Sequence, residues 1–141
     1  MKAWLATFVM TTAVAAAASA HLQDAVSKEM KPLQGTWVMT QVNGDATPGD
    51  TALVISGSKY SETVDGTVDE TGIFKIDASK TPMTVDLIIQ EGDAAGKTQL
   101  GIFDVKGDTM RLLLNRAGDR VRPTSLEKAD GELFIVAQKK K

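Results

Sequence analysis

The strongest constraint on the fold is a period-two alternation of apolar and polar residues that begins at Gly35 and recurs along the rest of the chain. The alternating segments are rich in β-branched residues and are separated by turn-forming pairs such as Asn43-Gly44 and Asp65-Gly66. They cover residues 35–42, 51–55, 59–64, 67–77, 83–90, 98–105, 109–115 and 132–138. This pattern predicts about eight β-strands joined by short turns.

The order of these segments predicts an all-β, antiparallel architecture. No second helical pattern occurs between them that could act as a βαβ crossover, so successive strands are expected to pair as an up-and-down meander. About eight such strands most readily close into a barrel, whose interior is filled by side chains or holds one small ligand. A β-sandwich is the alternative that the same pattern allows. Gly72, inside the segment 67–77, indicates a bulge or bend.

The first 20 residues differ from the rest and are set apart from the fold. Lys2 precedes an alanine-rich apolar run that ends in Ala18-Ser19-Ala20. This pattern is typical of a secretory signal peptide, so we expect cleavage after Ala20, one domain over residues 21–141, and a periplasmic or extracellular protein. A retained membrane anchor is the alternative, although the run falls short of the ~20 strongly apolar residues that a span needs. Apolar residues between His21 and Lys31 then recur at helical spacing, which predicts a short helix that ends before Pro32.

The composition excludes several kinds of site. The chain has no cysteine and one histidine, which rules out disulfides, thiolate metal sites, a thiol nucleophile, an acylated cysteine and a multi-histidine metal centre. Its 16 basic and 18 acidic residues give a net charge of -2. That balance gives no reason to expect nucleic acid or an anionic membrane as the main partner. We expect neither a cofactor nor a metal.

Motifs that suggest enzyme chemistry fail on their surroundings. Ser56-Gly57-Ser58-Lys59 matches the Ser-x-x-Lys of serine acyl enzymes but lies in an expected turn, where Lys is not one helical turn after Ser. The loop 92–98 lacks the spacing of a phosphate loop and leads into a strand. Asp65, Asp69 and Glu70 lack the geometry of a calcium loop and are interpreted as a solvated acidic turn. A non-enzymatic protein is therefore expected, while acidic or arginine-based chemistry inside a barrel stays open.

Some aromatic and basic side chains are candidates for contact with a ligand. These are Trp37, Tyr60, Phe103, Arg111 and Arg122. Trp37 is expected in the core near the closed end of the barrel, covered by a basic side chain, with Arg122 and Lys139 as candidates. Arg111 would clamp a carboxylate only if its strand face points inward, and we favour an exterior position for it.

Several stretches, taken in order, resemble a known kind of domain. Gly35-Thr36-Trp37 places a Gly-x-Trp on the first expected strand. It is followed by the stretch 72–82, Val85-Asp86-Leu87, the stretch 96–103, Gly107-Asp108-Thr109-Met110-Arg111-Leu112 and Arg122-Pro123-Thr124. Over nearly all of residues 30–138 the chain resembles a bacterial family of small exported lipocalin-like domains of unknown function. The resemblance implies a lipocalin-like barrel outside the cytoplasm and supplies no catalytic residues. Phe103 stands where members often have Tyr, and Leu126 where an aromatic is common.

Three functional hypotheses follow. The first is an exported, non-enzymatic barrel that binds a small apolar or amphipathic molecule, with an anionic head group if Arg111 or Arg122 lines the cavity. The second is an envelope protein-interaction or inhibitor module that uses the barrel as a scaffold for the loops 43–50, 92–97 and 115–131. An enzyme is third. Fold analogy alone does not decide among them.

Overall fold

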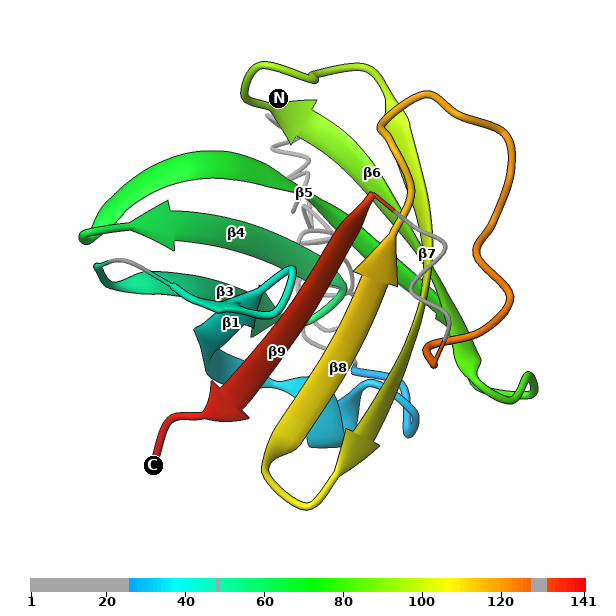
Figure 1. The fold of residues 1–141 in the computed structure, drawn as a ribbon, viewed down its shortest axis with the longest axis horizontal. Helices are drawn as coiled ribbons and strands as arrows, with labels where there is room; N and C mark the ends of the chain where they lie inside the picture. The colour runs from blue at the N-terminus through cyan, green and yellow to red at the C-terminus, as the bar shows by residue number, and fades with distance from the viewer. Residues whose placement is uncertain (1–25, 48, 128–131) are drawn as a thin grey trace, which may run out of the picture.

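Eight of the nine strands close into an antiparallel barrel (Figure 1). The structure is a computed structural model, and it describes residues 26–47, 49–127 and 132–141. The barrel strands are β1 (Gly35–Val42), β3 (Thr51–Ser56), β4 (Lys59–Val64), β5 (Thr67–Asp77), β6 (Met83–Glu91), β7 (Thr98–Lys106), β8 (Thr109–Leu114) and β9 (Leu133–Lys139). Each pairs with the next along the chain, and β1 pairs with β9. The predicted all-β antiparallel barrel is confirmed, in place of the β-sandwich.

The limits of these eight strands agree with the sequence prediction to within one residue. The strand outside the barrel, β2 (Asp45–Ala46), lies in the segment that was expected to be a loop. It folds back on β1 through the Asn43-Gly44 turn, so that Gln41 lies opposite Ala46. A strand this short and polar carries no alternation, which is why the pattern missed it.

The expected helix over residues 21–31 lies partly outside the described residues, as does the expected signal peptide. Within the described part, the chain makes a turn and then the 3₁₀ helix η1 (Lys31–Leu33), which contains Pro32 at its start. The expected helix is thus not confirmed, and Pro32 lies within η1, where proline is tolerated because its missing N–H needs no partner in a first helical turn. No helix in the described residues is long and apolar enough to cross a membrane.

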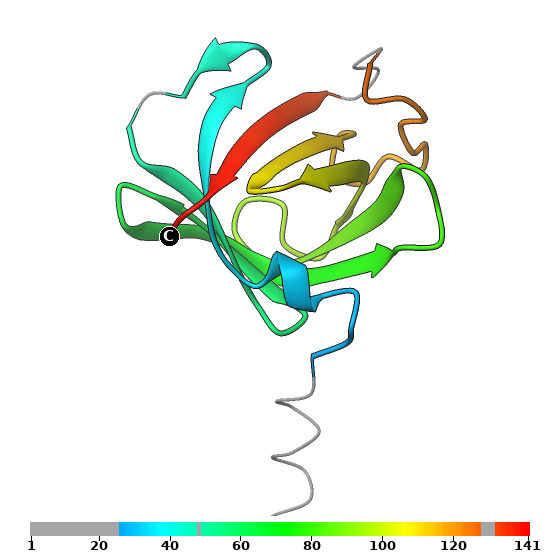
Figure 2. The same ribbon diagram turned by 90° about the horizontal axis from the view of Figure 1, so that it is seen from below.

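The two ends of the barrel differ, as Figure 2 shows. The helix end, as we call it, carries η1, the turns after β3, β5 and β7, and the end of β9. The loop end carries the β1–β2 hairpin, the turns after β4 and β6, and the long segment 115–132. The chain therefore closes one end with its own N-terminal turn and gathers its longer connections at the other.

Trp37 closes the helix end. Its side chain is fully buried, and its indole Nε1 donates a hydrogen bond to the Leu33 carbonyl at 2.9 Å. The Lys139 ammonium lies 5.6 Å from the centroid of the indole ring. A basic cover over Trp37 is thus confirmed, and of the two candidates it is Lys139 that supplies it.

Aromatic and aliphatic side chains fill the interior between the two ends. Tyr60, Phe74 and Phe103 form a chain of edge-to-face contacts, with ring centroids 6.4 and 5.9 Å apart. Each such contact contributes about 0.5–1.5 kcal/mol beyond the burial of area. All three side chains are at most 3% exposed, so the middle of the barrel is a packed core.

Gly72 marks a bulge, as the sequence predicted, because the register between β5 and β6 shifts between Thr71 and Gly72. The strands also approach closely there. A Cβ atom on Gly72 would lie 2.2 Å from the Ile88 carbonyl oxygen and 2.9 Å from Cε1 of Tyr60. Glycine is therefore required by space at this position.

Candidate functional site

Two glutamates and a tyrosine come together on the inner face of the barrel near the loop end. Tyr60 belongs to the core, and Glu62 follows it by two residues on β4, so both side chains point to the same face. The register places Glu62 directly opposite Glu70 of β5 on one side and Leu53 of β3 on the other. Tyr60 Oη donates a hydrogen bond to Glu70 Oε1 at 2.7 Å. We call Tyr60, Glu62 and Glu70 the interior polar cluster.

The cluster is electrostatically strained. Burial raises the pKa of the Glu62 carboxyl, and the charges of Glu70 and Asp69 raise it further. Burial also raises the pKa of the Tyr60 hydroxyl, helped by its hydrogen bond to Glu70 and by the charges of Glu70 and Glu62. Both groups thus hold their protons more tightly than they would in water.

Local sequence explains why the cluster points inward. Tyr60 is apolar enough to join the core and therefore fixes the inward face of β4, which carries Glu62 with it. A register shift between Glu62 and Thr63 then ends the regular alternation of this strand against β5. In the described part of the loop end, and apart from Arg122, the basic residues are Lys97, Arg116 and Arg120, and all three are exposed. They lie on loops between the strands. The alternation of side chains along β4 that points Glu62 inward therefore does not direct these basic side chains toward Glu62 and Glu70.

The two candidate arginines lie on the outer wall. Arg111 alternates with the buried Met110 and Leu112, and its guanidinium pairs with Asp104 of β7, with Nε 3.0 Å from Oδ1. The side chains of this pair are 35% and 24% exposed. The prediction of an anionic head group depended on Arg111 or Arg122 lining the interior, and the first of these faces away from it.

Arg122 fastens the described segment 115–127 to the outside of β6 and β7. Its Nη1 donates to the carbonyls of Val85 and Gly101, both at 2.9 Å, and its Nη2 pairs with Asp86 at 2.6 Å. Leu126 of the same segment covers outward-facing side chains of β7 and β8. The guanidinium is thus committed to holding this segment in place.

The remaining predicted residues divide between core and cluster. Trp37 and Phe103 are fully buried in the packed core, whereas Tyr60 belongs to the interior polar cluster. Sequence reasoning missed Glu62, and placed Glu70 in a solvated turn. The signal was present, since a glutamate two residues after a core tyrosine shares its face.

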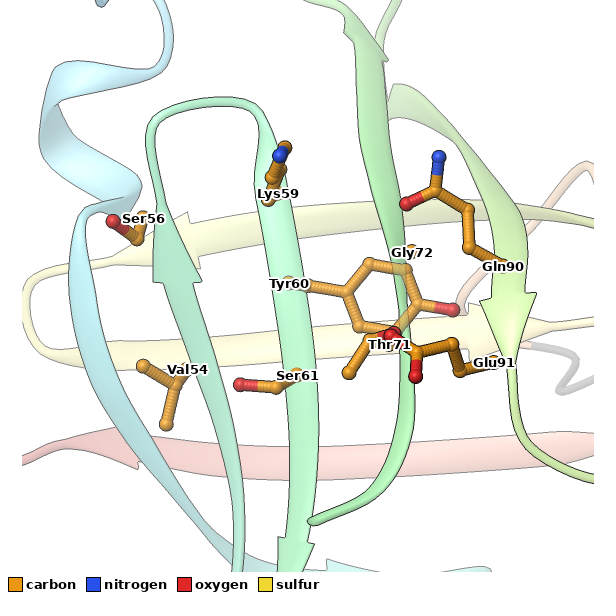
Figure 3. Close-up of a pocket in the computed structure, with 9 residues that line it drawn as sticks. All are labelled: Val54, Ser56, Lys59, Tyr60, Ser61, Thr71, Gly72, Gln90 and Glu91. Carbon is orange, nitrogen blue, oxygen red and sulfur yellow. The ribbon is translucent and has the colours of Figure 1, made fainter. Parts of the chain in front are cut away.

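A shallow groove of about 270 Å³ lies on the outer wall over β3 to β6. Figure 3 shows Tyr60 crossing behind Gly72, with Ser61, Thr71 and Glu91 in front. Thr71 Oγ1 donates to Glu91 Oε1 at 2.8 Å. Because Lys59 and Glu91 give this groove both signs of charge, it has no preference for a charged ligand.

Comparisons of the chain with models of known protein families, with curated proteins and with solved structures find no match. The described residues hold no group of three or more histidine, cysteine or acidic side chains arranged to bind a metal ion. The case for a function rests on the barrel and its interior polar cluster.

Proposed function

We propose that the protein is a lipocalin-like binding protein that holds one small amphipathic molecule at the loop end of the barrel. The ligand's apolar part would lie against the inner side chains there, and a cationic or hydrogen-bond-donating head group would face Glu62 and Glu70. The observation that carries the proposal is that the inward charged groups of the cluster are carboxylates. This changes the expected head group from anionic to cationic.

Physical chemistry supports this choice of ligand. Two carboxylates directly opposite each other repel, and a cation between them would relieve that repulsion and make charge-assisted hydrogen bonds. Such bonds contribute about 1.5–3 kcal/mol each, which is a factor of about 10–150 in affinity. Apolar neighbours such as Leu53 supply a surface for the hydrophobic part of the ligand. An exported location, expected from the first 20 residues, would expose the barrel to such molecules outside the cytoplasm.

The test uses two probes with the same alkyl chain. Isothermal titration of the full chain with dodecyltrimethylammonium and with dodecyl sulfate, both below their micelle concentrations, separates the head-group charge from the apolar tail. We expect saturable binding of the cationic probe and much weaker binding of the anionic one. Glu62→Gln/Glu70→Gln should weaken the cationic probe about tenfold or more.

The matched control is Asp93→Asn/Asp119→Asn, which removes two charges from exposed loop-end positions. It should change binding of the cationic probe by less than about threefold, because exposed charges are screened. Preferred binding of the anionic probe, absence of saturable binding, or equal effects of the two variants would each overturn the proposal. Melting temperatures of both variants establish that they are folded.

A further inference from the structure

The barrel separates its charges by sign along its axis, although the net charge is small. The helix end comprises residues 28–34, 56–59, 75–80, 106–109 and 139–141, and these hold nine lysines and three carboxylates. Its side-chain charge is therefore +6. At these positions the described cations are all lysines, and except for Lys139, which covers Trp37, they are exposed.

The loop end has the opposite charge. Residues 43–50, 62–70, 91–97 and 115–132 hold eleven carboxylates within the described part of the chain, against Lys97, Arg116 and Arg120. Arg122 also lies in these ranges, but it pairs with Asp86 on the barrel wall and is counted there. The side-chain charge of the described loop end is therefore -8. The other wall pair, Arg111 with Asp104, also cancels. The net charge of -2 in the described residues conceals two ends of opposite sign.

We infer that the helix end docks on a surface of anionic lipid head groups, with the loop end turned away from it. Lysine ammonium groups are hydrated point charges that attract a plane of phosphates without requiring a fixed geometry. The acidic loop end is repelled by the same surface, so the axis of the barrel becomes oriented as well as attracted. This inference rests on charge placement alone and is independent of the proposed ligand.

A lipid surface fits these observations better than a nucleic acid or a specific acidic protein. The lysines border several separate turns and the C-terminal segment at one end of the barrel, so their charge is spread over that end. In the described residues, no aromatic side chain is exposed for stacking on bases. Arginine, which supplies bidentate recognition of phosphate or carboxylate, is absent from the described helix end.

The chain also enters the barrel at this end. The described part starts at Val26 and leads into η1, on the lysine-rich side of the molecule. The sequence before Val26 includes an apolar run, which is a second source of membrane binding that the experiment has to separate from charge. The experiment below therefore separates attraction by charge from insertion of an apolar segment.

The experiment is co-sedimentation of the full chain with two kinds of vesicle, phosphatidylcholine alone and phosphatidylcholine mixed with phosphatidylglycerol. Binding to the first kind measures any contribution of the apolar run, and the excess on the second measures charge. We expect an excess at low salt that is lost at high salt. The variant Lys31→Gln/Lys80→Gln/Lys106→Gln should reduce that excess at least tenfold, since each lysine near an anionic surface contributes several-fold.

The control Lys97→Gln/Arg116→Gln/Arg120→Gln makes the same change in net charge at the loop end and should keep the excess. No excess on phosphatidylglycerol, or an equal loss in both variants, would overturn the inference. Two further outcomes would replace it. Binding to dextran sulfate without binding to vesicles would indicate a soluble polyanion. Salt-sensitive oligomers without vesicles, weakened by the lysine variant and kept by the control, would indicate head-to-tail self-association. Circular dichroism of each variant confirms folding.

Discussion

Gly72→Ala tests the close approach of strands on which the interior polar cluster depends. The added Cβ would lie 2.2 Å from the Ile88 carbonyl oxygen, whereas contacts below 3.0 Å are essentially never found. One of the strands must therefore move by at least 0.8 Å, the difference between these distances. The backbone of Ile88 is held in the β5–β6 ladder, so it cannot rotate away as a side-chain end would.

The expected loss of stability follows from this displacement. Overpacking of a folded core costs about 1–3 kcal/mol, and a clash with backbone belongs in the upper part of that range, about 2–3 kcal/mol. For a domain of this size, about 3–6 °C in melting temperature accompanies each kcal/mol, which gives a decrease of about 6–18 °C. The same methyl group would press on the Tyr60 ring at 2.9 Å and displace its hydroxyl from Glu70.

Urea unfolding and thermal melting measure the loss, and the ultraviolet absorbance of Tyr60, the sole tyrosine, reports the ring displacement. Ser61→Ala, on the outer face of the neighbouring strand, is the matched control and should change stability by less than about 0.5 kcal/mol. A Gly72→Ala protein that melts within about 2 °C of the wild type, well below the shift expected for 2 kcal/mol, would refute the reasoning.

Three other predictions address the cluster and the outer wall. Because folding raises the pKa of Glu62, the unfolded chain releases this proton first, and stability falls as pH rises from the ordinary pKa of a glutamate through the raised one. Glu62→Gln should therefore match the stability of the wild type below this pH window and exceed it above the window. Urea unfolding at a series of pH values measures the difference, and a difference of constant size would contradict the prediction. The phenol absorbance of Tyr60 should not titrate near its ordinary pKa while the protein is folded, and Glu70→Gln should move the titration back toward that pKa. Arg122→Gln should lower the free energy of unfolding by about 1–2 kcal/mol and speed hydrogen exchange in residues 116–127. The control Arg120→Gln, at an exposed site, should do neither, and equal exchange in the two variants would show that Arg122 does not fasten the segment.

The strands were predictable because the barrel makes the same demand on each of them. An inner face packed with side chains and an outer face in contact with solvent impose alternation, and turns such as Gly107-Asp108 interrupt it clearly. β2 lacked this signal, since it lies outside the closed ring and has no side chain in the core. The same reasoning explains why the strand limits agree so closely while the short extra strand was missed.

The site was less predictable because register and bulges decide which side chains meet. Alternation shows that Tyr60 and Glu62 share a face, but only the pairing of β4 with β5 brings Glu70 opposite Glu62. The register also shifts between Glu62 and Thr63. Regular pairing from the turn at Asp65-Gly66 would set Asp69 opposite Glu62 and would place Glu70 on the outer face. Arg111, which has no bulge between it and its turn, was correctly favoured as exterior.

The charge separation could have been predicted from the sequence, but not from its composition, because it depends on where along the chain the charges lie. In an up-and-down barrel, successive turns lie at alternate ends, so the parity of a turn assigns its charges to one end. The turns after β3, β5 and β7 carry four of the nine helix-end lysines, and the other five lie beside them in residues 28–34 and 139–141; the turns after β4, β6 and β8 carry most of the carboxylates. Once the strands are counted correctly, sorting charges by turn parity gives both ends their sign without any coordinates. A net charge near zero therefore does not exclude an anionic surface as a partner for a chain of this topology. Attraction to such a partner depends on the charge of each end. The vesicle experiment tests this dependence by changing the charge of one end at a time and measuring binding.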